Sequence, residues 1–167
     1  MAELTPQEKL QPSLLDRLTD DEPASSQESR SQRVLSVARL HQAVRRDLAW
    51  LLNTTSLSVS QPLDAYPLVA QSVVNFGGPD LTGVTLASLD LPELERLLRQ
   101  AIWTFEPRLL RQSVKVSVSA TSEMTRRALI FYVEGELWAQ PVPQRLFLKT
   151  EIDLETGNVT MVDAAGG

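Results

Sequence analysis

The sequence predicts an α+β protein in which N-terminal helices pack on a small C-terminal antiparallel β-sheet. Two amphipathic helical patterns lie in the first two-thirds of the chain, and alternating apolar segments rich in β-forming residues fill the last third. Because helices come first and strands last, segregated layers are favoured over an alternating parallel fold. We expect a single domain over residues 31–167, preceded by a tail over residues 1–30.

Composition narrows the classes of function. The chain has 167 residues, no cysteine and a net charge of −5. The missing cysteines exclude disulfides, thiolate zinc sites and cysteine nucleophiles. The negative charge argues against a nucleic-acid partner, and no segment reaches the run of about 18 apolar residues that would insert into a membrane. The N-terminus lacks a secretory leader pattern, so we expect a cytoplasmic protein.

The tail is interrupted by prolines and carries an acidic, serine-rich run over residues 20–29. This composition predicts a largely disordered segment. One short motif differs, because Ser13 can cap a helix whose leucines share one face. Two interpretations are open: a docking helix for a partner, or a segment that folds back onto its own domain. The motif residues are Leu14, Leu15, Arg17 and Leu18.

Apolar residues at three- and four-residue spacing predict a long helix from Val34 to Leu52, which ends in the turn-forming segment 53–56. His41 lies on the apolar stripe, where a structural role is favoured over catalysis. Trp50 stands beside the stripe, and we expect it to pack under the following loop. A basic face lies off the stripe and is either solvated or binds an acidic partner. Its residues are Arg33, Arg39, Arg45 and Arg46.

The middle of the chain predicts loop, short helix and loop, followed by a second long helix. Pro67 suits the start of the short helix, and Gly77 can supply a left-handed cap after it. Asp90 and Glu93 form a capping box for the long helix. Pro107 excludes helical geometry at the residue before it, so this helix should end near Phe105.

Four strands complete the predicted fold. The alternation over 114–119 is typical of a half-buried strand, whereas 128–133 has the continuous β-forming composition of a strand covered on both faces. The third strand spans 146–152. Hairpin residues 155–158 lead into a short fourth strand over 159–162.

The sequence contains few of the motifs that are typical of enzyme active sites. It lacks a nucleophile elbow, paired histidines and a phosphate-binding glycine loop, so we expect no enzyme activity, no cofactor and no metal. Glycosidases need only two suitably placed carboxylates, which leaves several acids to consider. Glu134 and Glu136 flank Gly135, a pattern that indicates a solvated turn. The acids considered are Asp80, Glu106, Glu134 and Glu136.

The segment Phe105-Glu106-Pro107-Arg108-Leu109 joins the second long helix to the first strand. Proline stiffens the backbone, and in an extended trio the side chains of Glu106 and Arg108 project to the same side. Two interpretations are open. The pair recognises complementary charges on a partner, or it forms an intramolecular ion pair that pins the junction.

Several segments carry a recognisable pattern in addition to the Glu106-Pro107-Arg108 core, namely 13–18, 46–54, 72–77, 79–83 and 147–157. In their order and spacing they resemble the TssE family of type VI secretion baseplate subunits. The Glu106-Pro107-Arg108 core is similar to one shared with the wedge proteins of contractile-phage baseplates. The resemblance covers nearly the whole chain.

This resemblance implies a non-enzymatic structural subunit that binds the wedge proteins TssF, TssG and TssK in a cytoplasmic baseplate docked at the inner membrane. It also implies a platform for assembly of the TssB–TssC sheath, with an open sheet edge that accepts a sheath strand. Glu106, Pro107, Arg108 and Leu109 become docking residues, and the segment from Leu14 to Leu18 becomes a tether to the wedge. The phage branch has also been described as lysozyme-like, so a peptidoglycan hydrolase is the alternative.

Overall fold

The computed structural model describes residues 13–19, 37–85, 88–120, 128–138 and 143–163. Its helices are α1 (Leu14–Leu18), α2 (Val37–Leu52), α3 (Pro67–Ala70) and α4 (Leu91–Phe105), and its short 3₁₀ turns are η2 (Leu57–Val59), η3 (Val73–Asn75) and η5 (Arg111–Ser113). Its strands are β1 (Lys115–Ala120), β2 (Ala128–Leu137), β3 (Gln144–Asp153) and β4 (Val159–Asp163). The prediction of disorder over residues 1–12 and 20–30 lies outside the described residues.

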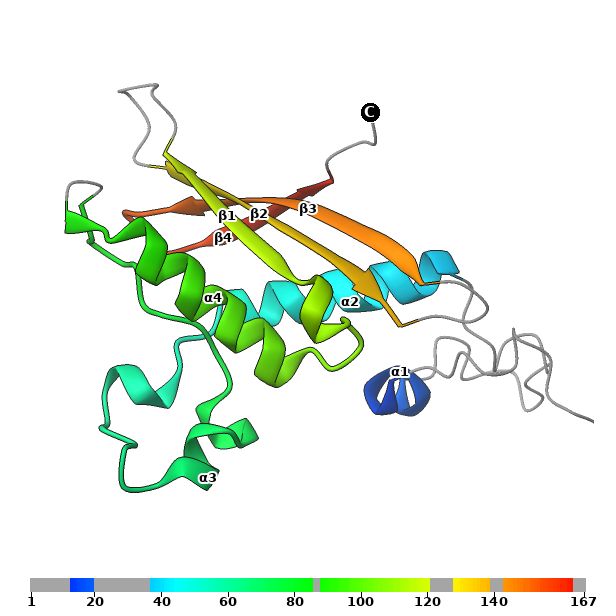
Figure 1. The fold of residues 1–167 in the computed structure, drawn as a ribbon, viewed down its shortest axis with the longest axis horizontal. Coiled ribbons are helices and arrows are strands. Elements are labelled where there is room, and N and C mark those ends of the chain that lie inside the picture. The colour runs from blue at the N-terminus through cyan, green and yellow to red at the C-terminus, as the bar shows by residue number, and fades with distance from the viewer. Residues whose placement is uncertain (1–12, 20–36, 86–87, 121–127, 139–142, 164–167) are drawn as a thin grey trace, which may run out of the picture.

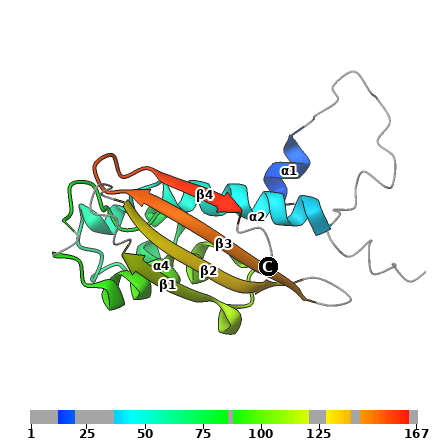
Figure 2. The same cartoon turned by 90° about the horizontal axis from the view of Figure 1, so that it is seen from above.

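The four strands form one antiparallel meander in the order β1-β2-β3-β4. Helices α2 and α4 lie on the same face of this sheet, with α4 against β1 and α2 against β4 (Figures 1 and 2). The predicted α+β fold, with helices first and the sheet last, is confirmed. Within the described part of the chain, no helix combines the length and apolar character needed to cross a membrane.

The core lies between the two long helices and the sheet. Both helices place apolar residues at helical spacing on the side that faces the strands, so the amphipathic stripes become buried surface. Burial of each such side chain contributes about 1.5–3 kcal/mol. The core includes Leu40, Val44, Leu48 and Leu51 of α2, Leu94, Leu98 and Ile102 of α4, and Leu129, Phe131, Val133, Leu148 and Ile152 of the sheet.

Helix α4 begins and ends where the sequence predicts. The carboxylate of Asp90 accepts a hydrogen bond of 3.2 Å from the backbone N–H of Glu93. At the other end, the N–H of Glu106 donates to the carbonyl of Ile102 at 2.9 Å, and Pro107 then prevents another turn. The hinge between α4 and the sheet is therefore set by local sequence.

Strand β2 corrects the prediction of cover on both faces. Leu129, Phe131 and Val133 are buried, but Ile130 and Tyr132 between them are only partly buried. Tyr132 stacks on Phe147 of β3 with ring centroids 5.7 Å apart. The continuous β-forming composition reflects this aromatic pair on the open face, not a second covering layer.

Two further local predictions are wrong. Trp50 does not pack under the following loop; its side chain is 51% exposed, with the Arg46 guanidinium 5.1 Å from its ring centre. Glu134 and Glu136 do not occupy a turn, because β2 continues through them to Leu137. The strand is prolonged there by an antiparallel bridge between Leu109 and Leu137.

Candidate functional site

Two side chains in the segment after α4 form an intramolecular ion pair. Nε of Arg108 donates to Oε1 of Glu106 at 2.7 Å, and Nη2 of Arg108 lies 2.6 Å from Oδ2 of Asp47 on α2. The backbone N–H of Arg108 also donates to Glu106, at 3.1 Å. One guanidinium thus ties the α4–β1 junction to the middle of α2.

The same network continues to the N-terminal motif. Arg46 donates from Nε to Oδ1 of Asp47 at 2.8 Å and from Nη1 to Oδ1 of Asp16 at 2.5 Å. We call the set Asp16, Arg46, Asp47, Glu106 and Arg108 the charged junction. Three segments that are far apart in sequence meet in it, namely α1, α2 and the end of α4.

Because the charged junction is partly buried, the protein should be sensitive to loss of either an acidic or a basic side chain from it. The Glu106 side chain is only 3% exposed. Burial alone would lower the pKa of Arg108, but the hydrogen bonds and charges of Glu106 and Asp47 outweigh it and raise that pKa. The Arg108 guanidinium is therefore held in its charged form, and its removal would leave the buried Glu106 side chain without its hydrogen-bond donors.

The docking residues expected from the resemblance differ from one another in solvent exposure. Glu106 and Leu109 are buried, Arg108 is partly buried, and Pro107 is exposed. The intramolecular ion pair, one of the two interpretations of this segment, is thus present. A role of these residues in docking remains a prediction.

Helix α1 combines features of both interpretations of its motif. Ser13 caps it, with its hydroxyl accepting from the N–H of Asp16, and Asp16 joins it to Arg46. Burial alone would raise the pKa of Asp16, but hydrogen bonds from Ser13 and Arg46 and the Arg46 charge lower it. The helix thus contacts its own domain through the carboxylate of Asp16. Its leucines remain exposed to solvent, with exposed fractions of 70% for Leu14, 44% for Leu15 and 74% for Leu18. The side chain of Arg17 is not among those described.

The basic face of α2 is partly engaged by the chain itself. Arg46 belongs to the charged junction, and Nη2 of Arg45 donates to the carbonyl of Met161 on β4 at 3.3 Å. Arg33 lies outside the described residues. Binding of an acidic partner by Arg45 and Arg46 therefore remains a prediction.

The sequence analysis missed an apolar surface, which is formed by the segment that connects α2 to α4. Residues 55–78 leave the body as a loop that carries η2, α3 and η3 (Figure 1), and Asp64 is the one charged residue in this stretch. We call it the apolar lobe. Its exposed side chains are Val59 at 50%, Tyr66 at 62%, Leu68 at 84%, Val73 at 82% and Val74 at 65%. An apolar run with so few charges was the available signal, but it was interpreted only as a short helix.

Polar groups and backbone contacts hold the apolar lobe in place. None of its helical turns buries an apolar residue, and the buried Asn75 accepts from the N–H of Ser58 and donates to the carbonyl of Ala70, both at 2.9 Å. Phe76 packs edge-on against Phe105 of α4, with ring centroids 5.3 Å apart. The lobe is thus fixed to the body while its apolar residues face outward.

Gly77 closes the neck of the lobe. Thr54 and Ser56 pair with Gly78 through hydrogen bonds of 2.8 and 3.0 Å. A Cβ on Gly77 would lie 2.5 Å from the carbonyl oxygen of Thr54, and its φ of +140° is one that side-chain-bearing residues rarely adopt. Glycine is needed here for close approach of two backbones, not for the helix cap that the sequence predicted.

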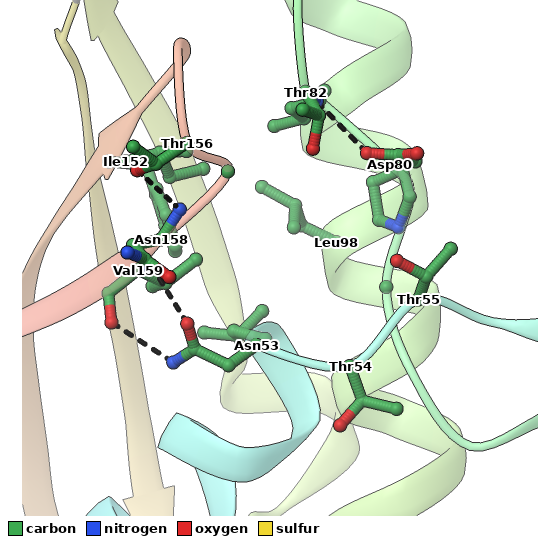
Figure 3. A pocket seen from close by; sticks show the side chains of 16 residues that line it. Asn53, Thr54, Thr55, Asp80, Thr82, Leu98, Ile152, Thr156, Asn158 and Val159 are labelled. Carbon is green, nitrogen blue, oxygen red and sulfur yellow. Dashed lines mark hydrogen bonds between the residues drawn. The ribbon is translucent and has the colours of Figure 1, made fainter.

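Both edges of the sheet carry side-chain hydrogen bonds. The amide of Asn53 binds the N–H and the carbonyl of Val159 on β4, at 2.9 and 3.0 Å (Figure 3). On the opposite edge, the N–H of Val118 donates to Glu95 of α4 at 2.8 Å. A strand that pairs with either edge along these residues would have to displace the side chain of Asn53 or of Glu95.

A small cavity of about 150 Å³ lies beside Asn53 (Figure 3). Residues from the end of α2, the 78–82 loop and the β3–β4 hairpin line it, and Asp80 is the only ionisable side chain among them. The N–H of Thr82 donates to Asp80 at 2.9 Å, and this hydrogen bond lowers the pKa of Asp80. The cavity therefore lacks the second carboxylate that glycoside hydrolysis requires.

The remaining candidates for chemistry lie apart. Burial lowers the pKa of His41, which favours the neutral imidazole. Glu134 and Glu136 line an open groove together with Lys115 and Arg145, whereas Glu106 is committed to the charged junction. Among the described residues, no three histidine, cysteine or acidic side chains are grouped to hold a metal.

Comparisons with known proteins give the following similarities. The family described as "Baseplate wedge protein gp25" matches residues 38–142. No curated protein matches the chain. A similar solved chain comes from "The baseplate complex from the type VI secretion system"; it is 17% identical, covers 68% of this chain and 94% of its own length, and has a TM-score of 0.46. The family match spans more than half of the sequence, and the chain therefore belongs to the baseplate wedge protein gp25 family.

Proposed function

We propose that this protein is a non-enzymatic structural subunit of a type VI secretion baseplate. In this proposal it binds the wedge proteins TssF, TssG and TssK and forms part of the platform on which the TssB–TssC sheath assembles. The baseplate would lie in the cytoplasm, docked at the inner membrane. Membership of the gp25 family supports the baseplate role, and the TssE-like segments in the sequence favour the secretion system over a phage tail.

The observation that carries the proposal is the apolar lobe. Soluble proteins seldom expose several large apolar side chains together unless the surface binds a partner. The lobe presents five such residues with one nearby carboxylate, which is the composition of the centre of a protein–protein interface. Its neck and its contact with Phe105 fix it before binding, which lowers the entropic cost of association.

We assign the apolar lobe to a wedge protein with a complementary apolar surface. A groove of about 750 Å³ runs between the lobe and α4, lined by Leu63, Leu97 and Phe105 among others. A side chain from the wedge protein can enter this groove while the exposed residues of the lobe pack around it. Asp64 is the only charged residue of the lobe, and Arg96, the other charged residue that lines the groove, is paired with Glu93, so apolar contact rather than ion pairing would supply the affinity.

The residues around Pro107 would then make a second contribution to binding of a partner. Glu106 and Leu109 are buried, so they act by holding the junction, and the exposed Pro107 and the open part of Arg108 are the atoms that a partner can touch. The exposed leucines of α1 offer a further tether to the wedge. A sheath strand would add to β1 or β4 only after displacing Glu95 or Asn53.

Co-expression tests the proposal. The tagged full chain is expected to capture TssF–TssG, and in a separate experiment TssB–TssC, at salt concentrations that remove charge-driven contacts. A folded chain that captures neither pair would refute the baseplate role. In that case clearing of a peptidoglycan suspension, compared with a Glu134→Gln, Glu136→Gln variant, would test the hydrolase alternative.

A further inference from the structure

Two arginines of this protein, Arg99 and Arg111, lie against the ring of one tryptophan. The guanidinium of Arg99 is 5.5 Å from the ring centre of Trp103, and that of Arg111 is 5.7 Å from the same centre. Arg99 lies one turn before Trp103 on α4, and Arg111 belongs to η5, which follows the end of that helix (Figure 1). We call Arg99, Trp103 and Arg111 the arginine–tryptophan patch.

The absence of a carboxylate partner distinguishes the two arginines of this patch from three other arginines in the described part of the chain. Arg46, Arg96 and Arg108 each form a salt bridge. Among the described residues, Arg99 and Arg111 have no carboxylate oxygen within salt-bridge distance. Two acids close to the patch in sequence are already engaged, because Glu95 accepts from Val118 and Glu106 binds Arg108.

The patch is also held in a fixed arrangement. Nη2 of Arg111 donates to the carbonyl of Trp103 at 3.3 Å, in the last turn of α4, where a cation is favoured by the helix dipole. The indole Nε1 of Trp103 is buried and has no hydrogen-bond partner. The ring thus serves as a surface for the guanidiniums and not as a donor, and contact with it limits the motion of both arginine side chains.

We propose that the arginine–tryptophan patch binds an acidic segment of a partner protein. Guanidiniums match carboxylates in a bidentate geometry, and two of them on a common ring can bind two acidic side chains of one peptide. The chain as a whole has a net charge of −5, so the two guanidiniums form a local positive surface on an acidic protein. This site is separate from the apolar lobe, and the proposal does not depend on the baseplate assignment.

Titration of the ¹⁵N-labelled full chain tests the proposal, with a peptide of alternating Asp and Ser as the probe. We expect saturable shifts of the Trp103 indole N–H and of the Arg99 and Arg111 amides. The Arg99→Gln, Arg111→Gln variant should bind at least tenfold more weakly. The control Arg145→Gln, Lys149→Gln makes the same charge change on β3 and should alter the affinity by less than threefold.

A second variant and a second probe complete the test. Arg99→Lys, Arg111→Lys keeps the charge but loses the planar fork, and binding between that of wild type and the glutamine variant would support recognition by guanidinium. Equal affinity of the wild type and the glutamine variant, or no saturable shift at millimolar peptide, would overturn the proposal. Tighter binding of a single-stranded oligonucleotide at the same signals would overturn it as well, in favour of a phosphate-binding surface.

Discussion

The charged junction and the apolar lobe invert the usual distribution of side chains. The junction buries Glu106 and joins it to Arg108 and Asp47, whereas the lobe exposes Leu68 and Val73 almost completely. Buried charges that are paired within the chain have little left to offer a partner, while exposed apolar surface gains free energy when it is covered. The comparison teaches that the most conspicuous motif, Glu-Pro-Arg, organises the fold, and that the less conspicuous loop is the better candidate for binding.

The largest effect is expected at the charged junction. Arg108→Ala leaves the carboxylate of Glu106 buried without a counter-charge, and we expect a loss of about 3–5 kcal/mol in the free energy of unfolding, measured by urea denaturation. Arg96→Ala is the matched control, because Arg96 forms an exposed pair with Glu93 one turn away. That control should change the unfolding free energy by less than about 0.5 kcal/mol. Similar small values for both variants would mean that the junction does not stabilise the fold.

The neck of the apolar lobe gives the next effect. Gly77→Ala adds both an unfavourable φ and a Cβ against the backbone of Thr54, and a loss of about 2–4 kcal/mol in unfolding free energy is expected from the two together. Gly83→Ala is the control, since Gly83 has a φ of +73° but no atom within 4 Å of an added Cβ. It should cost only about 1 kcal/mol. If the two variants are equally stable, close packing at the neck is not what fixes the lobe.

A smaller effect is expected at the β4 edge. Asn53→Ala removes the two hydrogen bonds to Val159 and should lower the unfolding free energy by about 1 kcal/mol. Because the edge is then open, hydrogen exchange of the β4 amides should accelerate. Unchanged exchange at Val159 would show that this side chain does not protect the edge.

The smallest effect concerns attachment of α1. The folded pKa of Asp16 is lowered, so its ion pair with Arg46 contributes stability that is fully present above the unfolded pKa of about 3.9 and is lost as the pH falls through the lower folded value. We expect a spin label on α1 to stay close to α2 at neutral pH and to separate from it in that acidic range. Asp16→Asn should show the separation at every pH, and a distance that does not respond to either change would contradict the attachment.

The sequence predicts the elements of this fold well because their signals are local. The cap at Asp90, the stop before Pro107 and the hairpin at 155–158 each depend on a few adjacent residues, and all lie where predicted. The open face of β2 could not be predicted in the same way, since stacking of Tyr132 on Phe147 depends on the register between two strands.

The candidate binding surfaces were also harder to predict from the sequence, because they too depend on contacts between segments that are far apart in the chain. An ion pair of Glu106 and Arg108 was one of two interpretations of their spacing around Pro107, but the participation of Asp47 and Asp16 depends on packing of α2 and α1. The apolar run from Leu68 to Val74 predicted only a short helix between two loops. Its exposed position depends on contacts between distant segments, namely the neck at Gly77 and Thr54 and the packing of Phe76 on Phe105.

Capture of TssF–TssG by a lobe variant tests the central claim most directly. Leu68→Asp, Val73→Asp alters exposed side chains, so the unfolding free energy should change by less than about 0.5 kcal/mol for each residue. The control Gln42→Asp, Ser88→Asp makes the same charge change at exposed positions outside the lobe. We predict that the wild type and the control retain TssF–TssG on the affinity resin, and that the folded lobe variant loses them. Retention of TssF–TssG by the lobe variant at the wild-type level would contradict the account.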